Sequence, residues 1–218
     1  MKKILIGISL SLCIGSYPIV EASQLKPNET LIEAGGAFIS HGEARSFISE
    51  SAHAQSGYAV SVIHAINDRL SVKYNASNFL SEDKELLGIV SNSRARTNDI
   101  NFIYRLNDYA DIVFGYEHNK FTYGAIVNPE VKTTFQAGFN LHKDLNDKAQ
   151  LYAVYLKGKD TSLAEIGIQY DLTPNSKLSL SYGIHEVKDV DLTIDCLNIH
   201  SKVDYKMSGL LMMYGAKL

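Results

Sequence analysis

The chain has 218 residues and a formal net charge of −3, without a long basic run, so nucleic acid is not an expected partner. Its 13 Tyr and 8 Phe are accompanied by no Trp and only 4 Pro, and Tyr and Phe favour β-strands. Beyond the N-terminal region no apolar run reaches the ~20 residues that a membrane-spanning helix needs. A chain of this kind can cross a bilayer only as a closed β-barrel.

The N-terminus has the pattern of a secretory signal. Lys2 and Lys3 precede an apolar run over 4–14, and Val20 and Ala22 are small residues at the −3 and −1 positions of a cleavage site. The predicted organisation is a cleaved signal peptide at 1–22, a short periplasmic segment at 23–29 and an outer-membrane barrel at 30–218. The part after the signal contains one cysteine, Cys196, so no internal disulfide is expected.

The rest of the chain alternates between apolar and polar residues with a period of two, which is typical of strands. The alternation is clearest over 164–172 and 177–185. Runs of this kind lie at 30–40, 56–66, 69–77, 98–106, 110–118, 131–141, 148–157, 163–172, 177–187 and 207–218. They predict an all-β, up-and-down antiparallel barrel of about ten strands, with eight as the alternative.

The connections between these runs alternate between short and long. Asn67-Asp68, Asn107-Asp108, Asn146-Asp147 and Pro174-Asn175 mark four tight turns. The other connections are polar and mostly longer, at 41–55, 78–97, 119–130, 158–162 and 188–206. This order predicts short periplasmic turns, longer outer loops and both chain ends on the periplasmic side.

The signal peptide, the Leu106-Asn107 and Leu145-Asn146 turns, the loop order and the closing strand over 210–218 together resemble the small bacterial outer-membrane β-barrel superfamily. Its members include OmpA-type transmembrane domains and porin-like proteins. The resemblance covers residues 30–218 and rests on pattern. It implies a location in the bacterial outer membrane, with the membrane lipid and the barrel assembly machinery as partners.

We expect the more apolar face of each strand to point outward to lipid. Two rings of aromatic side chains then lie on that face, at the depths where such rings favour the membrane boundary. The predicted girdle consists of Phe38, Tyr58, Tyr74, Tyr116, Phe135, Tyr155 and Tyr182 near the outer ends, and Tyr104, Phe139, Tyr170 and Tyr214 near the turns. A soluble barrel with these rings in its interior is the alternative.

The opposite face would line the lumen, and it carries both acids and bases. The predicted charge network is Glu33, Lys73, Arg105, Glu117 and Glu165. A barrel of this size is only just wide enough for side chains to fill it, so paired charges would plug it; a narrow water-filled pore is the alternative. Arg105→Ala separates the two, because it should destabilise a plug by ~3–5 kcal/mol but mainly alter the ion selectivity of a pore.

The expected function is therefore a non-catalytic structural protein or narrow diffusion channel of the outer membrane. An interaction module that binds surface ligands through its outer loops is the alternative, and a lipid- or peptide-modifying enzyme is a third. The histidines at the outer ends (His41, His53, His118, His185 and His200) form no metal-binding spacing, so we expect solvent-facing side chains without a metal or cofactor.

Overall fold

The computed structural model describes residues 25–45, 49–81, 84–86, 89–91, 93–123, 130–194 and 199–218. The predicted signal peptide and its cleavage site lie outside these residues. The ten barrel strands are β1 (Thr30–Arg45), β2 (Ser49–Ala65), β3 (Leu70–Ser81), β6 (Ser93–Asn107), β7 (Ala110–Tyr123), β8 (Glu130–Asn146), β9 (Ala149–Gly158), β10 (Thr161–Thr173), β11 (Ser176–Ile194) and β12 (Ile199–Lys217).

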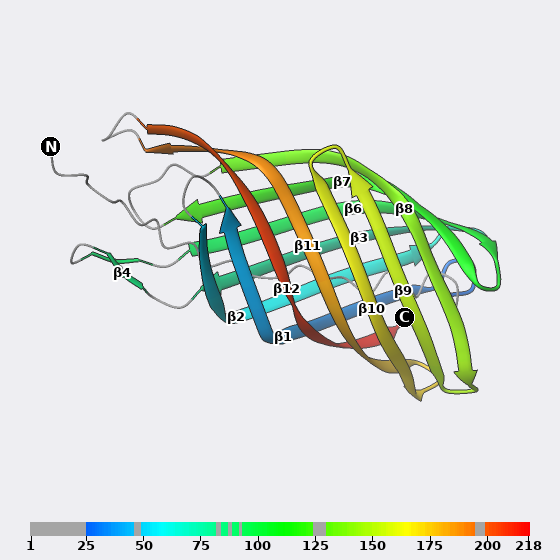
Figure 1. Ribbon diagram of the computed structural model, residues 1–218. Coiled ribbons are helices and arrows are strands. Elements are labelled where there is room, and N and C mark those ends of the chain that lie inside the picture. The colour runs from blue at the N-terminus through cyan, green and yellow to red at the C-terminus, as the bar shows by residue number, and fades with distance from the viewer. Residues whose placement is uncertain are drawn as a thin grey trace, which may run out of the picture.

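These strands form one closed antiparallel barrel, in the order β1-β12-β11-β10-β9-β8-β7-β6-β3-β2 (Figure 1). The first and last strands pair with each other along most of their length, from Leu31 opposite Lys217 to Arg45 opposite Asp204. The prediction of ten strands is therefore confirmed, and the eight-stranded alternative is wrong. The described residues contain no helix that is long and apolar enough to cross a membrane.

The four tight turns lie where the sequence predicts them, and three of them are held by an asparagine side chain. Asn67 Oδ1 accepts hydrogen bonds from the backbone N–H groups of Arg69 and Leu70, both at 2.9 Å. Asn107 and Asn146 cap their turns in the same way. An asparagine that bonds the backbone two residues further on mimics a turn, which is why this residue recurs at each hairpin.

All four turns lie at one end of the barrel, here named the turn end; the opposite end is the loop end. Both ends of the barrel sequence also lie at the turn end, because Leu218 N donates to Thr30 O at 2.8 Å and Lys217 N to Asn175 O at 2.9 Å.

At the loop end the strands are longer than the sequence predicts. The expected loops at 41–55 and 188–206 are largely strand, with β1–β2 pairing reaching Arg45–Ser49 and β11–β12 pairing reaching Ile194–Ile199. The expected loop at 78–97 holds a separate hairpin, β4 (Lys84–Leu86) and β5 (Ile89–Ser91), which projects beyond the barrel in Figure 1. In the β11–β12 extension the inward positions remain apolar, with Val190, Val203 and Tyr205 buried, but outward positions such as Lys202 and Asp204 are polar. The apolar outer face that identifies the membrane-spanning strands is therefore missing there.

Candidate functional site: the barrel interior and its outer rim

The outward faces of the strands are largely apolar, and the inward faces carry both polar and apolar side chains. Large hydrophobic side chains are exposed on every barrel strand, among them Ile100, Phe114, Ile166 and Leu180. The buried set includes many polar side chains, such as Asn75, Asn101 and Gln136. A globular protein in water distributes its residues the other way round, whereas a barrel in lipid has this arrangement.

The predicted girdle side chains can be placed for ten of the eleven residues; the side chain of Phe38 lies outside the described part. The exposed ones are Tyr58, Tyr74, Tyr116, Phe135, Tyr155, Tyr182, Tyr104, Phe139, Tyr170 and Tyr214. The soluble alternative, which would bury these rings inside, does not fit this placement.

Aromatic contacts join neighbouring strands within the girdle. The rings of Tyr116 and Phe135 meet edge to face with centroids 5.4 Å apart. The hydroxyl of Tyr74 donates to Asn98 Oδ1 at 3.1 Å, and Asn78 Nδ2 donates to the hydroxyl of Tyr58 at 3.2 Å. An apolar ring with a hydrogen-bonded polar tip suits a boundary between an apolar and an aqueous layer.

The five side chains of the predicted lumen charge network all lie within the described residues. Glu33, Lys73, Glu117 and Glu165 are buried, and Arg105 is half-buried opposite Asp111 in the strand register. The hydroxyl of Ser61 donates to Glu33 at 2.6 Å, and the hydroxyl of Tyr152 donates to Glu165 at 2.9 Å.

Glu117 makes a contact that crosses the lumen. His185 Nε2 lies 3.0 Å from Glu117 Oε1, although β8, β9 and β10 separate their strands in the barrel wall. Asn119 Nδ2 also donates to this carboxylate. The expectation of a solvent-facing side chain is wrong for His185, which is 1% exposed, because it shares the inward parity of its strand.

A second buried acid, Asp99, accepts hydrogen bonds from side-chain amides beside this contact. Asp99 accepts hydrogen bonds from Asn75 Nδ2 at 3.0 Å and from Asn101 Nδ2 at 2.6 Å. Gln136 Nε2 extends the network to Asn101 Oδ1 at 3.3 Å. Asp99 is absent from the predicted charge network, although it has the same strand parity as Arg105. Together with Glu117 and His185, these groups form a polar layer across the barrel.

An apolar layer lies on the loop-end side of the polar layer. Phe121 on β7 stacks on Tyr205 on β12 with ring centroids 4.7 Å apart, and four strands separate β7 from β12 in either direction. Phe79 is also buried, and its ring occupies the place where a side chain at Gly57 would stand. The interior is therefore bridged at two heights, first by polar and then by aromatic side chains.

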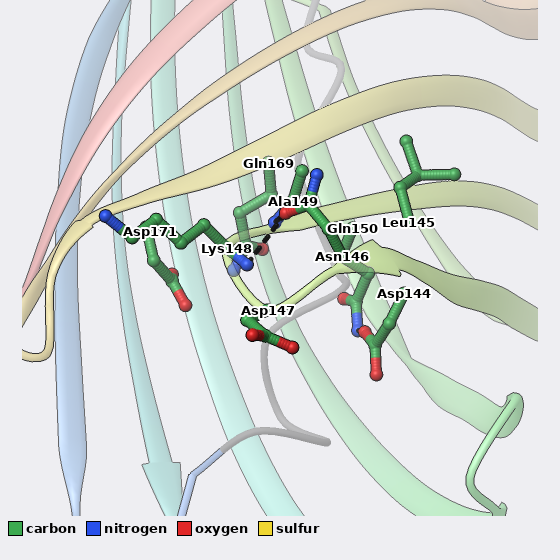
Figure 2. A pocket seen from close by; sticks show the side chains of 9 residues that line it. All are labelled: Asp144, Leu145, Asn146, Asp147, Lys148, Ala149, Gln150, Gln169 and Asp171. Atoms are coloured by element: carbon green, nitrogen blue, oxygen red, sulfur yellow. Dashed lines mark hydrogen bonds between the residues drawn. The ribbon is translucent and has the colours of Figure 1, made fainter.

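At the turn end polar contacts are again present, beside a buried apolar cluster that includes Leu31, Ile63 and Ile103. Asn140 Nδ2 donates to Asp111 Oδ2 at 2.9 Å, and His142 Nε2 lies 3.5 Å from the same oxygen. A pocket of about 300 Å³ lies here between the β8–β9 turn and β10. Figure 2 shows its lining residues: Asp144, Leu145, Asn146, Asp147, Lys148, Ala149, Gln150, Gln169 and Asp171. Within the described part of the chain, no group of three or more His, Cys, Asp or Glu is arranged to hold a metal ion.

Ion pairs join the strands at the loop end. The turn between β9 and β10 is short, so β8 and β11 continue past it, and Lys132 bridges the two. Its ammonium lies 2.8 Å from Asp160 Oδ2 and donates to Asp189 O at 3.2 Å. The hydrogen bond from Lys132 holds the pKa of the Asp160 carboxyl below its usual value. On the neighbouring hairpin, Lys206 pairs with Glu186 at 3.5 Å and Lys202 with Asp189 at 3.6 Å.

No protein-family model matches the chain, and no curated protein matches it. Several solved structures are similar to this chain. The outer membrane protease OmpT of Escherichia coli is 9% identical with a TM-score of 0.51, over 90% of this chain and 100% of that one. The outer membrane protein OprG of Pseudomonas aeruginosa is 13% identical with a TM-score of 0.46, over 88% and 97%. Ail, the attachment invasion locus protein of Yersinia pestis, is 13% identical with a TM-score of 0.43, over 88% and 99%. The chain has the closed antiparallel fold of outer-membrane β-barrels.

Proposed function

We propose that this protein is a non-catalytic barrel of the bacterial outer membrane whose lumen is closed to ions and solutes by its own side chains. The membrane location is supported by the apolar outer surface, by the two sets of exposed rings and by the polar interior. Outer-membrane lipid and the barrel assembly machinery are the partners that such a location requires.

The proposal of a closed lumen rests on two side-chain contacts that cross the barrel interior. The Glu117–His185 contact and the Phe121–Tyr205 stack each join strands on different sides of the barrel, and they do so at different heights. All four side chains are at most 2% exposed. A hydrated ion would have to break both contacts to pass.

Burial also supports a non-catalytic role. A catalytic base must reach the proton that it removes from a substrate or nucleophile. His185 is enclosed with Glu117, and His118, another histidine near the outer end, is exposed with its ring Nδ1 2.8 Å from the hydroxyl of Thr133.

Planar-bilayer recording tests the closed lumen. The full chain without its signal peptide, folded into the bilayer, should show no unit conductance. Stepwise conductance whose ion selectivity changes in Lys73→Gln would contradict the proposal, because Lys73 lines the lumen below both contacts. Fractionation with outer membranes, and a gel mobility that changes on heating, test the location separately.

A role in surface interaction is the second candidate, supported by the length of the outer strands. β11 and β12 have 19 residues each, and their pairing continues to Ile194 and Ile199. A strand tilted by about 45° needs only ~9–11 residues to cross a bilayer. The paired residues of β11 and β12 beyond that length would stand above the membrane, and adhesion assays after exchange of 188–206 test this role.

A further inference from the structure

Two cations face each other on the outer surface at the loop end of β6 and β7. Arg96 is the direct register partner of Lys120, and Arg94 lies two residues further along β6 on the same face. Both arginines are exposed and Lys120 is half-buried. Like charges directly opposite each other destabilise a strand pair. An opposite charge beside this pair would compensate the repulsion.

The compensation does not come from the neighbouring positions. On β3, Arg96 faces Asn78 and Arg94 faces Leu80; on β7, Arg94 faces Thr122. Within the described part of the chain, none of the three cations has an ion pair or a hydrogen bond to a carboxylate.

The other side of the rim is built differently. Lys206 faces Glu186 as its register partner and pairs with it at 3.5 Å, and Lys132 pairs with Asp160 at 2.8 Å. Cations on β8 and β12 thus have acids beside them, whereas those on β6 and β7 have neutral neighbours. Within the described residues, the register partners of Arg94 and Arg96 include no acid, so an external anion would find these cations available.

The position of these cations relative to the aromatic girdle indicates the source of the anion. Tyr116 of the girdle is 62% exposed on β7, and Lys120 follows it four residues later on the same face. At ~3.4 Å per residue, Lys120 stands roughly 13 Å along the strand beyond the ring. Girdle rings lie at the boundary of the apolar layer, and long cationic side chains extend from there to the headgroups.

We propose that Arg94, Arg96 and Lys120 bind the phosphate group of an anionic lipid in the outer leaflet. Guanidinium groups bind phosphate oxygens in a bidentate fork, and the ammonium adds a third positive charge. This site rests on the proposed membrane location, since its partner is a lipid in the leaflet that surrounds the barrel.

Native mass spectrometry of the full chain without its signal peptide tests the site, with phosphatidic acid and phosphatidylcholine as probes. The wild type should retain phosphatidic acid in preference. Arg96→Gln with Lys120→Gln should lower that affinity by about 100-fold or more, given ~1.5–3 kcal/mol for each of the two charged hydrogen bonds lost. Lys206→Gln is the matched control, because Glu186 already pairs with this lysine, and it should change the affinity little.

Three results would overturn the site: equal retention of the two lipids, an equal loss in Lys206→Gln, or displacement of phosphatidic acid by inorganic phosphate alone.

Folding in phosphatidylcholine vesicles gives an independent measurement. There the double variant should raise the thermal midpoint, because it removes the repulsion, whereas a lowered midpoint would show that the cations have partners within the protein. A chain that inserts into vesicles without preferring phosphatidic acid contradicts only this site; one that does not insert contradicts the membrane location.

Discussion

The ring of Phe121 on β7 stacks on the ring of Tyr205 on β12, 4.7 Å from centroid to centroid and 23° from parallel, across the full width of the barrel. Two side chains from opposite walls thus meet in the lumen, which a barrel of this strand number is narrow enough to allow. The stack closes the loop end above the polar layer. It also ties together strands that share no backbone hydrogen bond.

Phe121→Ala should lower the free energy of unfolding by about 3–5 kcal/mol, the usual cost of removing a large buried ring and leaving a cavity. Urea titration of the protein in lipid vesicles measures this. Tyr205→Phe keeps the stacked ring and is the control, so it should cost much less. An equal loss in both variants would show that the phenol oxygen, and not the stack, carries the stability.

Glu117 and His185 should be energetically coupled. Removing one partner leaves the other buried without its contact, at a cost of about 3–5 kcal/mol. Glu117→Gln and His185→Gln should therefore each destabilise the barrel, and the double variant should cost clearly less than their sum. A double-mutant cycle on unfolding free energies measures the coupling. Simple additivity would mean that the 3.0 Å contact does not hold the layer together.

The sequence allows the membrane part of this architecture to be predicted, but not the contacts that close it. Alternation and the Asn67, Asn107 and Asn146 turns define strands, parity and topology, because lipid requires one apolar face. Phe121 and Tyr205 fall in regions expected to be loops, since the outward positions beside them, such as Lys120 and Asp204, are polar. Which residues meet across the lumen depends on the stagger of the whole barrel. No local pattern encodes this stagger, so the contact between His185 and Glu117 could not be predicted from the sequence.

Gly167 makes room for the ring of Tyr152, its register partner on β9. A Cβ at Gly167 would clash with Tyr152 Cζ, so Gly167→Ala must displace the ring and its hydrogen bond to Glu165. We expect a loss of about 1–3 kcal/mol in unfolding free energy, as for other overpacked interiors. Gly36→Ala is the control, because its nearest atom is Gly57 O at 3.3 Å. Tyr152→Leu combined with Gly167→Ala should cost less than the sum of the single variants; full additivity would contradict the assigned packing.

Lys132 should control the titration of Asp160 at the outer rim. The ammonium favours the charged carboxylate, so the pKa of Asp160 is lowered from its ordinary value of 3.8. An acid whose pKa is lowered by folding adds stability above its ordinary pKa, and this contribution is lost as the pH falls through the lowered value. The Lys132–Asp160 bridge between β8 and the β9–β10 turn should therefore persist at neutral pH and weaken only below about pH 4.

Carbon NMR of the Asp160 carboxyl should show its pKa rising toward the ordinary value in Lys132→Gln. Lys202→Gln removes a weaker and more distant influence on the same group, so it should shift the pKa less. An equal shift in the two variants would mean that the general positive charge of the rim, and not the 2.8 Å contact, sets the pKa of Asp160.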